Sequence, residues 1–297
     1  MVSVIPLRYG TAFKKAFSDP EVFAAFAGDV LGLTLRFSKV EQEKAFSPPV
    51  GKVDVRFDLY GEDEEHRVIV ELQHVREKDA FERFHYYHLI AQVEQVASSK
   101  NYAVNRTVYT IVVLTRLPNE EHLRFDIASQ SSDLITHDGR KLGLFNHRIV
   151  FLNSRAVSPT TPEPIRTWLE LFEDSLDQEV DESAFPNPLF RRVIDTIAQG
   201  HVSPEEMYHL KEEASWEDSK EASFREGKAE GKAEGKAEGL REGEAKGRAE
   251  GLRQAIFDLC DVLGIFVDAD RMAQLDGLAA DELDAFRQQL KRSKQWR

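Results

Sequence analysis

Two neighbouring segments alternate between apolar and polar residues, which is the pattern of half-buried β-strands. In residues 52–60 (KVDVRFDLY) one face is apolar and consists of Val53, Val55, Phe57 and Leu59. The other face is polar and consists of Asp54, Arg56, Asp58 and Tyr60. In residues 67–75 (RVIVELQHV) one face consists of Val68, Val70 and Leu72. The other face consists of Ile69, Glu71 and Gln73. The polar residues 61–65 predict a turn, so the two strands should form a β-hairpin.

Helices and further strands are predicted on both sides of this hairpin. Apolar residues recur at helical spacing in residues 11–32, and a break near Ser18-Asp19-Pro20 predicts two short helices instead of one. Residues 79–98 predict another helix. Strands are predicted at residues 33–40, 107–114, 123–127 and 147–152. This order of elements predicts an α/β fold, with a mixed sheet flanked by helices.

The C-terminal half is predicted to be helical and acidic. Residues 226–251 repeat glycine at every fourth position, which predicts a marginal helix because each interior glycine costs ~1 kcal/mol relative to alanine. This helix is either a solvated spacer or a partner for another helix through its glycine row. Residues 252–290 predict a helical hairpin whose apolar face needs a partner, either the N-terminal domain or a second copy of the chain. The predicted domains are 1–160 (α/β core), 161–220 (acidic helical extension), 221–251 (repeat helix or linker) and 252–297 (helical hairpin).

Charge and composition restrict the function less than the patterns do. The net charge is −13, yet residues 1–125 hold 16 Lys and Arg against 18 Asp and Glu, so the N-terminal half is nearly neutral and can meet nucleic acid. The single cysteine, Cys260, excludes an intrachain disulfide. We expect no membrane-spanning segment and no signal peptide, and therefore a cytoplasmic protein.

The polar faces of the hairpin carry the candidate chemistry. If Asp58 lies opposite Glu71, the other cross-strand pairs are Tyr60/Ile69, Arg56/Gln73, Phe57/Leu72 and Leu59/Val70. Two carboxylates with Cβ atoms about 5 Å apart repel each other unless a cation lies between them, and Mg²⁺ or Mn²⁺ suits such oxygen ligands. A row of charges on a strand is also the ordinary pattern of a solvated face. Asp54 shares the face and is the alternative metal ligand to Asp58.

Several short motifs, taken in order, resemble one nuclease family. The stretches Val53–Tyr60 and Arg67–Gln73 resemble the core of PD-(D/E)XK nuclease family transposases, the recombination-promoting nuclease group, in which an acidic residue, an apolar residue and Gln follow a strand-borne Asp. Phe13-Lys14 resembles the family's first helix, Arg83 and Tyr87 its Arg-x-x-x-Tyr helix, and the Glu-Gly-x-Ala repeats its C-terminal tail. The resemblance covers roughly residues 8–251.

This resemblance implies a restriction-endonuclease-like core and roles for individual residues. Asp58 and Glu71 would bind Mg²⁺ or Mn²⁺, with the backbone carbonyl of Leu72 as a third ligand, and Gln73 would orient the attacking water or touch the phosphate. The candidate substrate-binding residues are Arg56, Arg83 and Tyr87. Gly10 departs from the pattern, because members of the family often have an acidic residue there.

Two functions therefore follow as hypotheses. The first is a Mg²⁺-dependent DNA endonuclease that hydrolyses phosphodiester bonds in recombination, mobile-element biology or phage defence, with DNA as its partner. The second is a catalytically degenerate protein on the same fold that binds or assembles, forming a homo-oligomer through residues 226–290. Gly10 and the overall acidity motivate the second hypothesis.

Overall fold

The computed structural model describes residues 1–46, 55–74, 80–96, 103–117 and 121–296. The chain divides into an N-terminal unit, residues 1–219, and a C-terminal unit, residues 220–297. Helix α6 (Pro204–Leu263) begins in the first unit and ends in the second. No helix in the described part of the chain is both long enough and apolar enough to cross a membrane.

Six strands form one mixed sheet in the N-terminal unit, in the spatial order β2-β3-β4-β5-β7-β6. Their bounds are Glu41–Phe46 (β2), Val55–Glu62 (β3), His66–Gln73 (β4), Thr107–Leu114 (β5), Ile127–Ser131 (β6) and Arg148–Asn153 (β7). Strands β4, β5 and β7 run parallel at the centre, whereas β2, β3 and β6 are antiparallel to their neighbours. A separate small sheet pairs β1 (Val2–Ser3) with β8 (Glu179–Val180).

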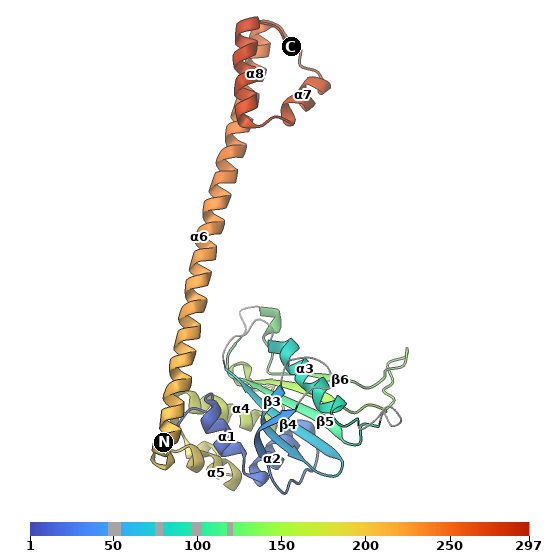
Figure 1. The fold of residues 1–297 in the computed structure, drawn as a ribbon, viewed down its shortest axis with the longest axis vertical. Helices are drawn as coiled ribbons and strands as arrows, with labels where there is room; N and C mark the ends of the chain where they lie inside the picture. The colour runs from blue at the N-terminus through green and yellow to red at the C-terminus, as the bar shows by residue number, and fades with distance from the viewer. Residues whose placement is uncertain (47–54, 75–79, 97–102, 118–120, 297) are drawn as a thin grey trace. The chain divides into compact units, whose positions relative to one another are not determined.

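Helices cover both faces of the six-stranded sheet (Figure 1). One face packs against α1 (Gly10–Phe17), α2 (Pro20–Leu31), α4 (Ile165–Asp174) and α5 (Pro188–Ile197), and the other against α3 (Ala80–Val93). Short 3-10 helices span Glu121–Leu123, Ser154–Ala156, Ser175–Asp177, Glu182–Ala184 and Gln199–His201. The predicted fold class, a mixed sheet flanked by helices with a helical C-terminal tail, is confirmed.

An aromatic cluster fixes α1 against the other helices of its layer. The ring of Phe17 lies 5.1 Å from Phe13, 5.2 Å from Phe26 and 5.5 Å from Phe172, measured between centroids. Trp168 completes the cluster, with its centroid 5.8 Å from that of Phe17. Such pairs add about 0.5–1.5 kcal/mol each beyond the burial of their surface. The cluster therefore sets the position of α1 firmly with respect to the sheet.

The break between the first two helices is confirmed and has a clear cause. Asp19 caps α2, because its Oδ1 accepts hydrogen bonds from the backbone N–H groups of Glu21 at 2.8 Å and Val22 at 3.2 Å. Pro20 occupies the first helical position, where its missing N–H costs nothing. These local signals end α1 and start α2 independently of the rest of the fold.

Three predicted boundaries were wrong. Residues 33–40 form no strand, and the strand β2 begins only at Glu41. The reason is that Leu35 and Phe37 are buried under α2, where the ring of Phe37 lies 5.3 Å from that of Phe23. The strand predicted at residues 123–127 begins only at Ile127, after a 3-10 turn. Helix α3 ends at Val93, short of the predicted residue 98.

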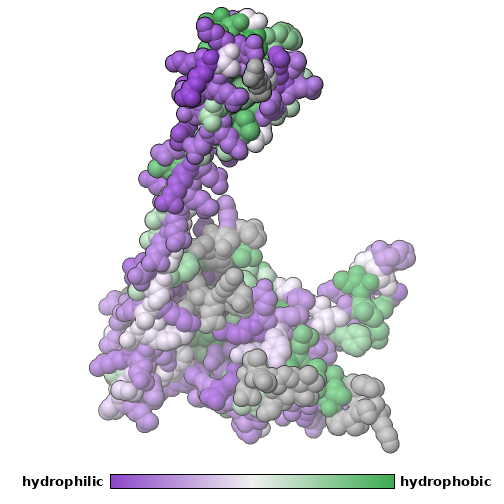
Figure 2. Space-filling view, turned by 45° about the horizontal axis from the view of Figure 1, so that its top comes forward, coloured by the Kyte–Doolittle hydropathy of each residue, from purple (hydrophilic) through white to green (hydrophobic). Residues whose placement is uncertain are grey.

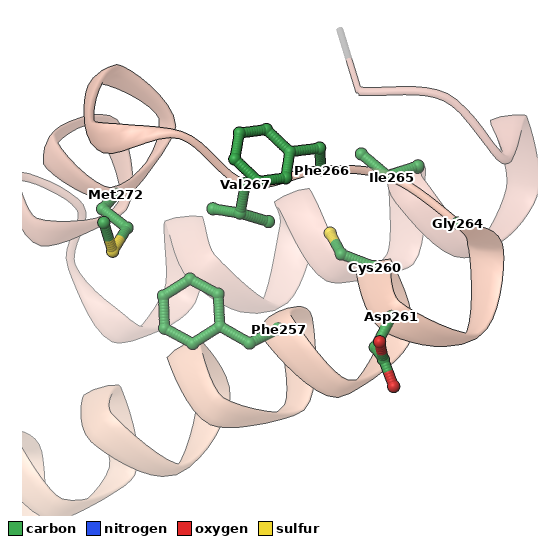
Figure 3. Close-up of a pocket in the computed structure, with 8 residues that line it drawn as sticks. All are labelled: Phe257, Cys260, Asp261, Gly264, Ile265, Phe266, Val267 and Met272. Atoms are coloured by element: carbon green, nitrogen blue, oxygen red, sulfur yellow. The ribbon is translucent and has the colours of Figure 1, made fainter.

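The C-terminal unit contains the end of α6, α7 (Ala269–Asp276) and α8 (Ala280–Ser293). These helices bury Ile256, Cys260, Leu275, Leu283 and Leu290, so Cys260 lies in the core of this unit. Figure 3 shows a hollow on this unit, about 500 Å³ in volume, whose lining is mainly apolar and has Asp261 as its only charged residue.

Candidate active site

Asp58 and Glu71 lie where the backbone pairing of β3 and β4 ends. Leu59↔Val70 is the last pair of the ladder in this direction. Beyond it, the N–H of Asp58 donates to Oε1 of Glu71 at 3.2 Å, and the N–H of Leu72 donates to Oδ2 of Asp58 at 3.0 Å. Each side-chain carboxylate thus takes a hydrogen bond that a backbone carbonyl accepts in a regular ladder. The result is a fork between the two strands, with both carboxylates inside it.

The fork confirms the predicted register in part. The pairs Leu59/Val70 and Tyr60/Ile69 form as predicted. The predicted pairs Asp58/Glu71, Phe57/Leu72 and Arg56/Gln73 are absent from the ladder, so that part of the prediction was wrong. The physical reason is that the two carboxylates bind the N–H groups that would otherwise continue the pairing.

The other neighbour of β3 is distorted at the same level. Strand β2 pairs with β3 at Gln42↔Leu59 and at Lys44↔Phe57, but the intervening Glu43 has φ 53° and makes no pair with Asp58. A positive φ is uncommon for a residue other than glycine and marks local strain. Asp58 is therefore released from regular pairing on both sides, which frees its side chain to serve the site.

This distortion also overturns the predicted single apolar face of β3. Leu59 packs in the cluster on the α1 and α2 side. Val55 and Phe57 pack instead with Tyr60 and Ile69 on the other face, in the cluster that includes residues of α3. Strict alternation between the faces holds only for a regular strand, and it changes phase at Asp58.

Burial makes the two carboxylates costly to ionise together. Burial raises the pKa of Asp58, although the hydrogen bond from Leu72 and the charge of Lys14 partly oppose this. Burial raises the pKa of Glu71 well above its ordinary value, and the negative charge of Asp58 raises it further. Glu71 has only 5% of its surface exposed. A cation bound between them would remove this repulsion.

Two basic side chains approach the pair from opposite faces of the sheet. Lys14, on α1, forms an ion pair with Glu43, and its charge lowers the pKa of Asp58. Arg83, on α3, donates from Nη2 to the amide oxygen of Gln73, and its charge lowers the pKa of both Asp58 and Glu71. Burial opposes the shift, but the bond to Glu43 and the nearby acids raise the pKa of Lys14, so it stays charged.

Three predicted residues remain: Arg56, Tyr87 and Asp54. Arg56 is exposed, and its Nε lies 3.8 Å from a Glu43 oxygen. Tyr87 packs its ring against Phe57, with the centroids 5.8 Å apart. The alternative ligand Asp54 lies outside the described residues.

Helix α6 brings carboxylates that the sequence did not point to. The carboxylate of Glu213 accepts a hydrogen bond from the N–H of Thr11 at 3.0 Å, and its oxygens lie 3.8 and 3.9 Å from where a Cβ on Gly10 would be. Glu213 therefore lies beside Gly10, the position where the resemblance leads us to expect an acidic residue. The distance of 202 residues along the chain explains why no sequence signal revealed it.

A mixed-charge cleft lies at the carboxyl ends of β4 and β5. It has a volume of about 670 Å³. Its lining includes His74, the residue that follows Gln73 in the chain. Its charged lining residues are Arg8, Arg116, Arg155, Glu173, Asp174 and Asp177. In sheets with parallel strands, ligands bind at this edge.

The donor set at the fork fits a magnesium-type ion. Among the described residues no group of three or more His, Cys, Asp or Glu side chains is placed to hold a metal. The predicted set is smaller, consisting of Asp58, Glu71 and the carbonyl of Leu72. Mg²⁺ is usually held by only one or two carboxylates together with water and substrate phosphate, so the carboxylates of Asp58 and Glu71 suffice.

A mixed sheet whose forked strands hold an acidic pair beside an apolar residue and Gln defines a nuclease-type fold of the PD-(D/E)XK class. The model of the PD-(D/E)XK nuclease family transposase matches residues 37–223, which is more than half of the chain. The chain belongs to this family. The match begins after α1 and ends before the glycine repeat, so the resemblance of those two segments stays a prediction. Neither the search of curated proteins nor that of solved structures gave a match.

Proposed function

We propose that this protein is a metal-dependent DNA endonuclease that hydrolyses phosphodiester bonds and acts in recombination, mobile-element biology or phage defence. Membership of the nuclease family supports the class of reaction. The single observation that carries the proposal is the fork, where β3 and β4 give up backbone pairing and the partly buried Asp58 lies beside the buried Glu71. Two acids so placed destabilise a fold that has no use for them, and a bound cation removes their repulsion.

In this proposal Asp58, Glu71 and the carbonyl of Leu72 hold Mg²⁺ or Mn²⁺. When bound, such an ion orients a water molecule and stabilises negative charge on the phosphate. Each carboxylate commits one oxygen to a backbone N–H, which fixes its orientation and leaves the second oxygen for a ligand. Asp58 and Glu71 are thereby held in place before any ion or DNA arrives.

Gln73 and its neighbour Arg83 act together in this proposal. Arg83 holds the amide oxygen of Gln73, so the amide nitrogen is the end that donates to the water or to a phosphate oxygen. A glutamine carries no positive charge, which leaves the charge of the phosphate to be balanced elsewhere. Arg83 serves this purpose on the α3 side, and Lys14 serves it on the α1 side.

Lys14 is the basic residue that we add to the predicted site. Its ammonium group is held by Glu43, the residue with strained backbone opposite Asp58. A phosphate at the fork would compete with the Glu43 carboxylate for the same ammonium group, because both are anionic oxygen ligands. Lys14 would then exchange Glu43 for the phosphate when DNA binds.

Cleavage of supercoiled plasmid tests the proposal directly. We expect cutting by the wild-type protein in Mg²⁺ or Mn²⁺, and its loss in Asp58→Ala and in Glu71→Ala. The matched control is Glu64→Ala, since Glu64 is an exposed acid in the turn of the same hairpin. Equal metal-dependent cutting by all four proteins would remove Asp58 and Glu71 from the site.

A second candidate function is assembly through residues 226–290 with no catalysis. It is favoured by the glycine row of α6, which consists of the seven glycines from Gly227 to Gly251. No atom of the described residues lies within 4 Å of where a Cβ would stand on any of them, so a partner helix could approach this row closely. Seven interior glycines lower the stability of an isolated helix by about 7 kcal/mol relative to alanine, which a partner helix would offset. Light scattering of full-length protein and of Leu240→Glu, an exposed apolar position in this segment, tests it. Identical monomers in both samples would exclude assembly through α6.

A further inference from the structure

The two edges of the six-stranded sheet differ in how they are protected. Strand β2, at one edge, carries Glu41, Glu43 and Lys44 and has the backbone distortion at Glu43. Charges and distortions of this kind keep natural edge strands from pairing with other chains. Strand β6, at the opposite edge, has the sequence Ile-Ala-Ser-Gln-Ser and carries no charge and no proline. Among the described residues no strand pairs with the outer edge of β6, so this edge is open to pairing with a further strand.

The chain continues from β6 into an ordered arm, residues 132–147. Its two sides are joined by hydrogen bonds from the N–H of Ser132 to the carbonyl of His147 and from the N–H of Leu142 to the carbonyl of Leu134, both at 3.0 Å. The carboxylate of Asp133 accepts bonds from the N–H groups of Gly143, at 2.7 Å, and Leu144, at 2.9 Å. This polar network gives the arm a defined shape without help from the core.

The arm exposes a group of large apolar side chains. The exposed fractions are 49% for Leu134, 63% for Ile135, 39% for Leu142, 63% for Leu144 and 48% for Phe145. In Figure 2 the arm projects from the N-terminal unit and shows a patch coloured as hydrophobic. Five such side chains expose several hundred Å² together, which for a monomer marks a surface that binds a partner.

We propose that the β6 edge and the arm form an interface with a second copy of this chain, in which the two β6 strands pair antiparallel and the two arms cover each other. Residues 127–146 contain two acids, Asp133 and Asp138, and two bases, Arg140 and Lys141, so the segment is neutral. The whole chain has a net charge of −13, so two copies repel each other overall. Two copies can therefore meet at this segment without that repulsion. In a dimer with two-fold symmetry, the same surface of both copies forms the contact, so a single segment supplies both sides of the interface.

An apolar, neutral surface suits a protein partner better than DNA, which is bound through basic residues. The interface is also separate from residues 226–290, so it stands independently of assembly through α6. It does not depend on nuclease activity either, because none of its residues belongs to the fork.

The first experiment measures the mass of the full-length protein in solution over a dilution series. We expect a dimer for the wild type, and a dissociation constant raised roughly tenfold or more in Ile135→Glu and in Leu144→Glu, because each places a charge in an apolar contact. Tyr208→Glu is the matched control, since Tyr208 has a similar exposure of 60% but lies on α6, outside both the arm and residues 226–290. A wild type that stays monomeric, or a dimer that Ile135→Glu and Leu144→Glu leave intact, would overturn the proposal.

The second experiment tests the strand pairing itself. Ser129 is the central residue of β6, and in an antiparallel pair centred there the two Ser129 Cα atoms lie about 4.5–5.5 Å apart, within reach of a disulfide. We expect Ser129→Cys, in a chain that also carries Cys260→Ala, to form a disulfide-linked dimer under mild oxidation. Ala45→Cys, at an exposed position of the charged β2 edge, should remain a monomer in the same background. Equal cross-linking at both edges, or none at Ser129, would contradict pairing through β6.

Discussion

Glu217, on α6, should make the stability of the N-terminal unit depend on pH. Burial raises the pKa of its carboxyl to about 7 from 4.5, although Arg8 opposes the shift. The carboxylate lies 4.0 Å from Nε of Arg8 and 3.9 Å from Nε2 of His74, the residue after Gln73. The carboxyl is therefore easier to protonate in the folded protein than in the unfolded chain.

The sign and size of the effect follow from this difference. A carboxyl group with a raised pKa binds its proton more tightly when folded, so its contribution to stability is complete below the unfolded pKa and is lost as the pH rises through the folded value. A difference of about 2.5 units corresponds to about 3 kcal/mol, most of it lost between about pH 5 and pH 8. Glu217→Gln cannot ionise and avoids this loss.

Urea unfolding of the full-length protein at pH 5 and pH 8 measures the effect. We expect Glu217→Gln to match the wild type within about 1 kcal/mol at pH 5 and to exceed its free energy of unfolding by about 2–3 kcal/mol at pH 8. Glu205→Gln, an exposed acid on the same helix, is the control and should leave the pH dependence unchanged. A Glu217→Gln protein that is no more stable than wild type at pH 8 would refute the reasoning.

Four further predictions concern the site and the frame around it. If Lys14 binds the phosphate as proposed, Lys14→Met should slow plasmid cutting roughly ten- to hundredfold, whereas Lys15→Met, whose wild-type side chain pairs with Glu206, should not. Mg²⁺ at about 100 times its dissociation constant should stabilise the wild type by ~2.7 kcal/mol in thermal unfolding, and Glu71→Gln should lose most of this gain. Gly61→Ala should cost about 1–3 kcal/mol in urea unfolding, because its Cβ would lie 2.8 Å from the Phe23 ring. Gly235→Ala should raise helicity by circular dichroism and stabilise α6 by about 1 kcal/mol, since its Cβ meets open space; unchanged helicity would argue against a continuous helix there.

Local sequence patterns determined much of this protein. Alternation in residues 67–73 set the faces of β4, and the Asp19-Pro20 signal set the break between α1 and α2. The register at Leu59/Val70 also followed from the sequence, because a hairpin with one apolar face tolerates few alternatives. Such features depend on neighbours along the chain, so one sequence is enough to predict them.

The tertiary structure alone decided how the site is built. The fork and the change of phase at Asp58 arise because carboxylates replace backbone partners, which no alternation pattern encodes. Lys14 reaches Glu43 across 29 residues, and Glu213 reaches Thr11 across 202. Contacts at such separations depend on how the helices pack against the sheet. The sequence alone therefore named the acidic pair, whereas packing of the whole chain selected the charges around it.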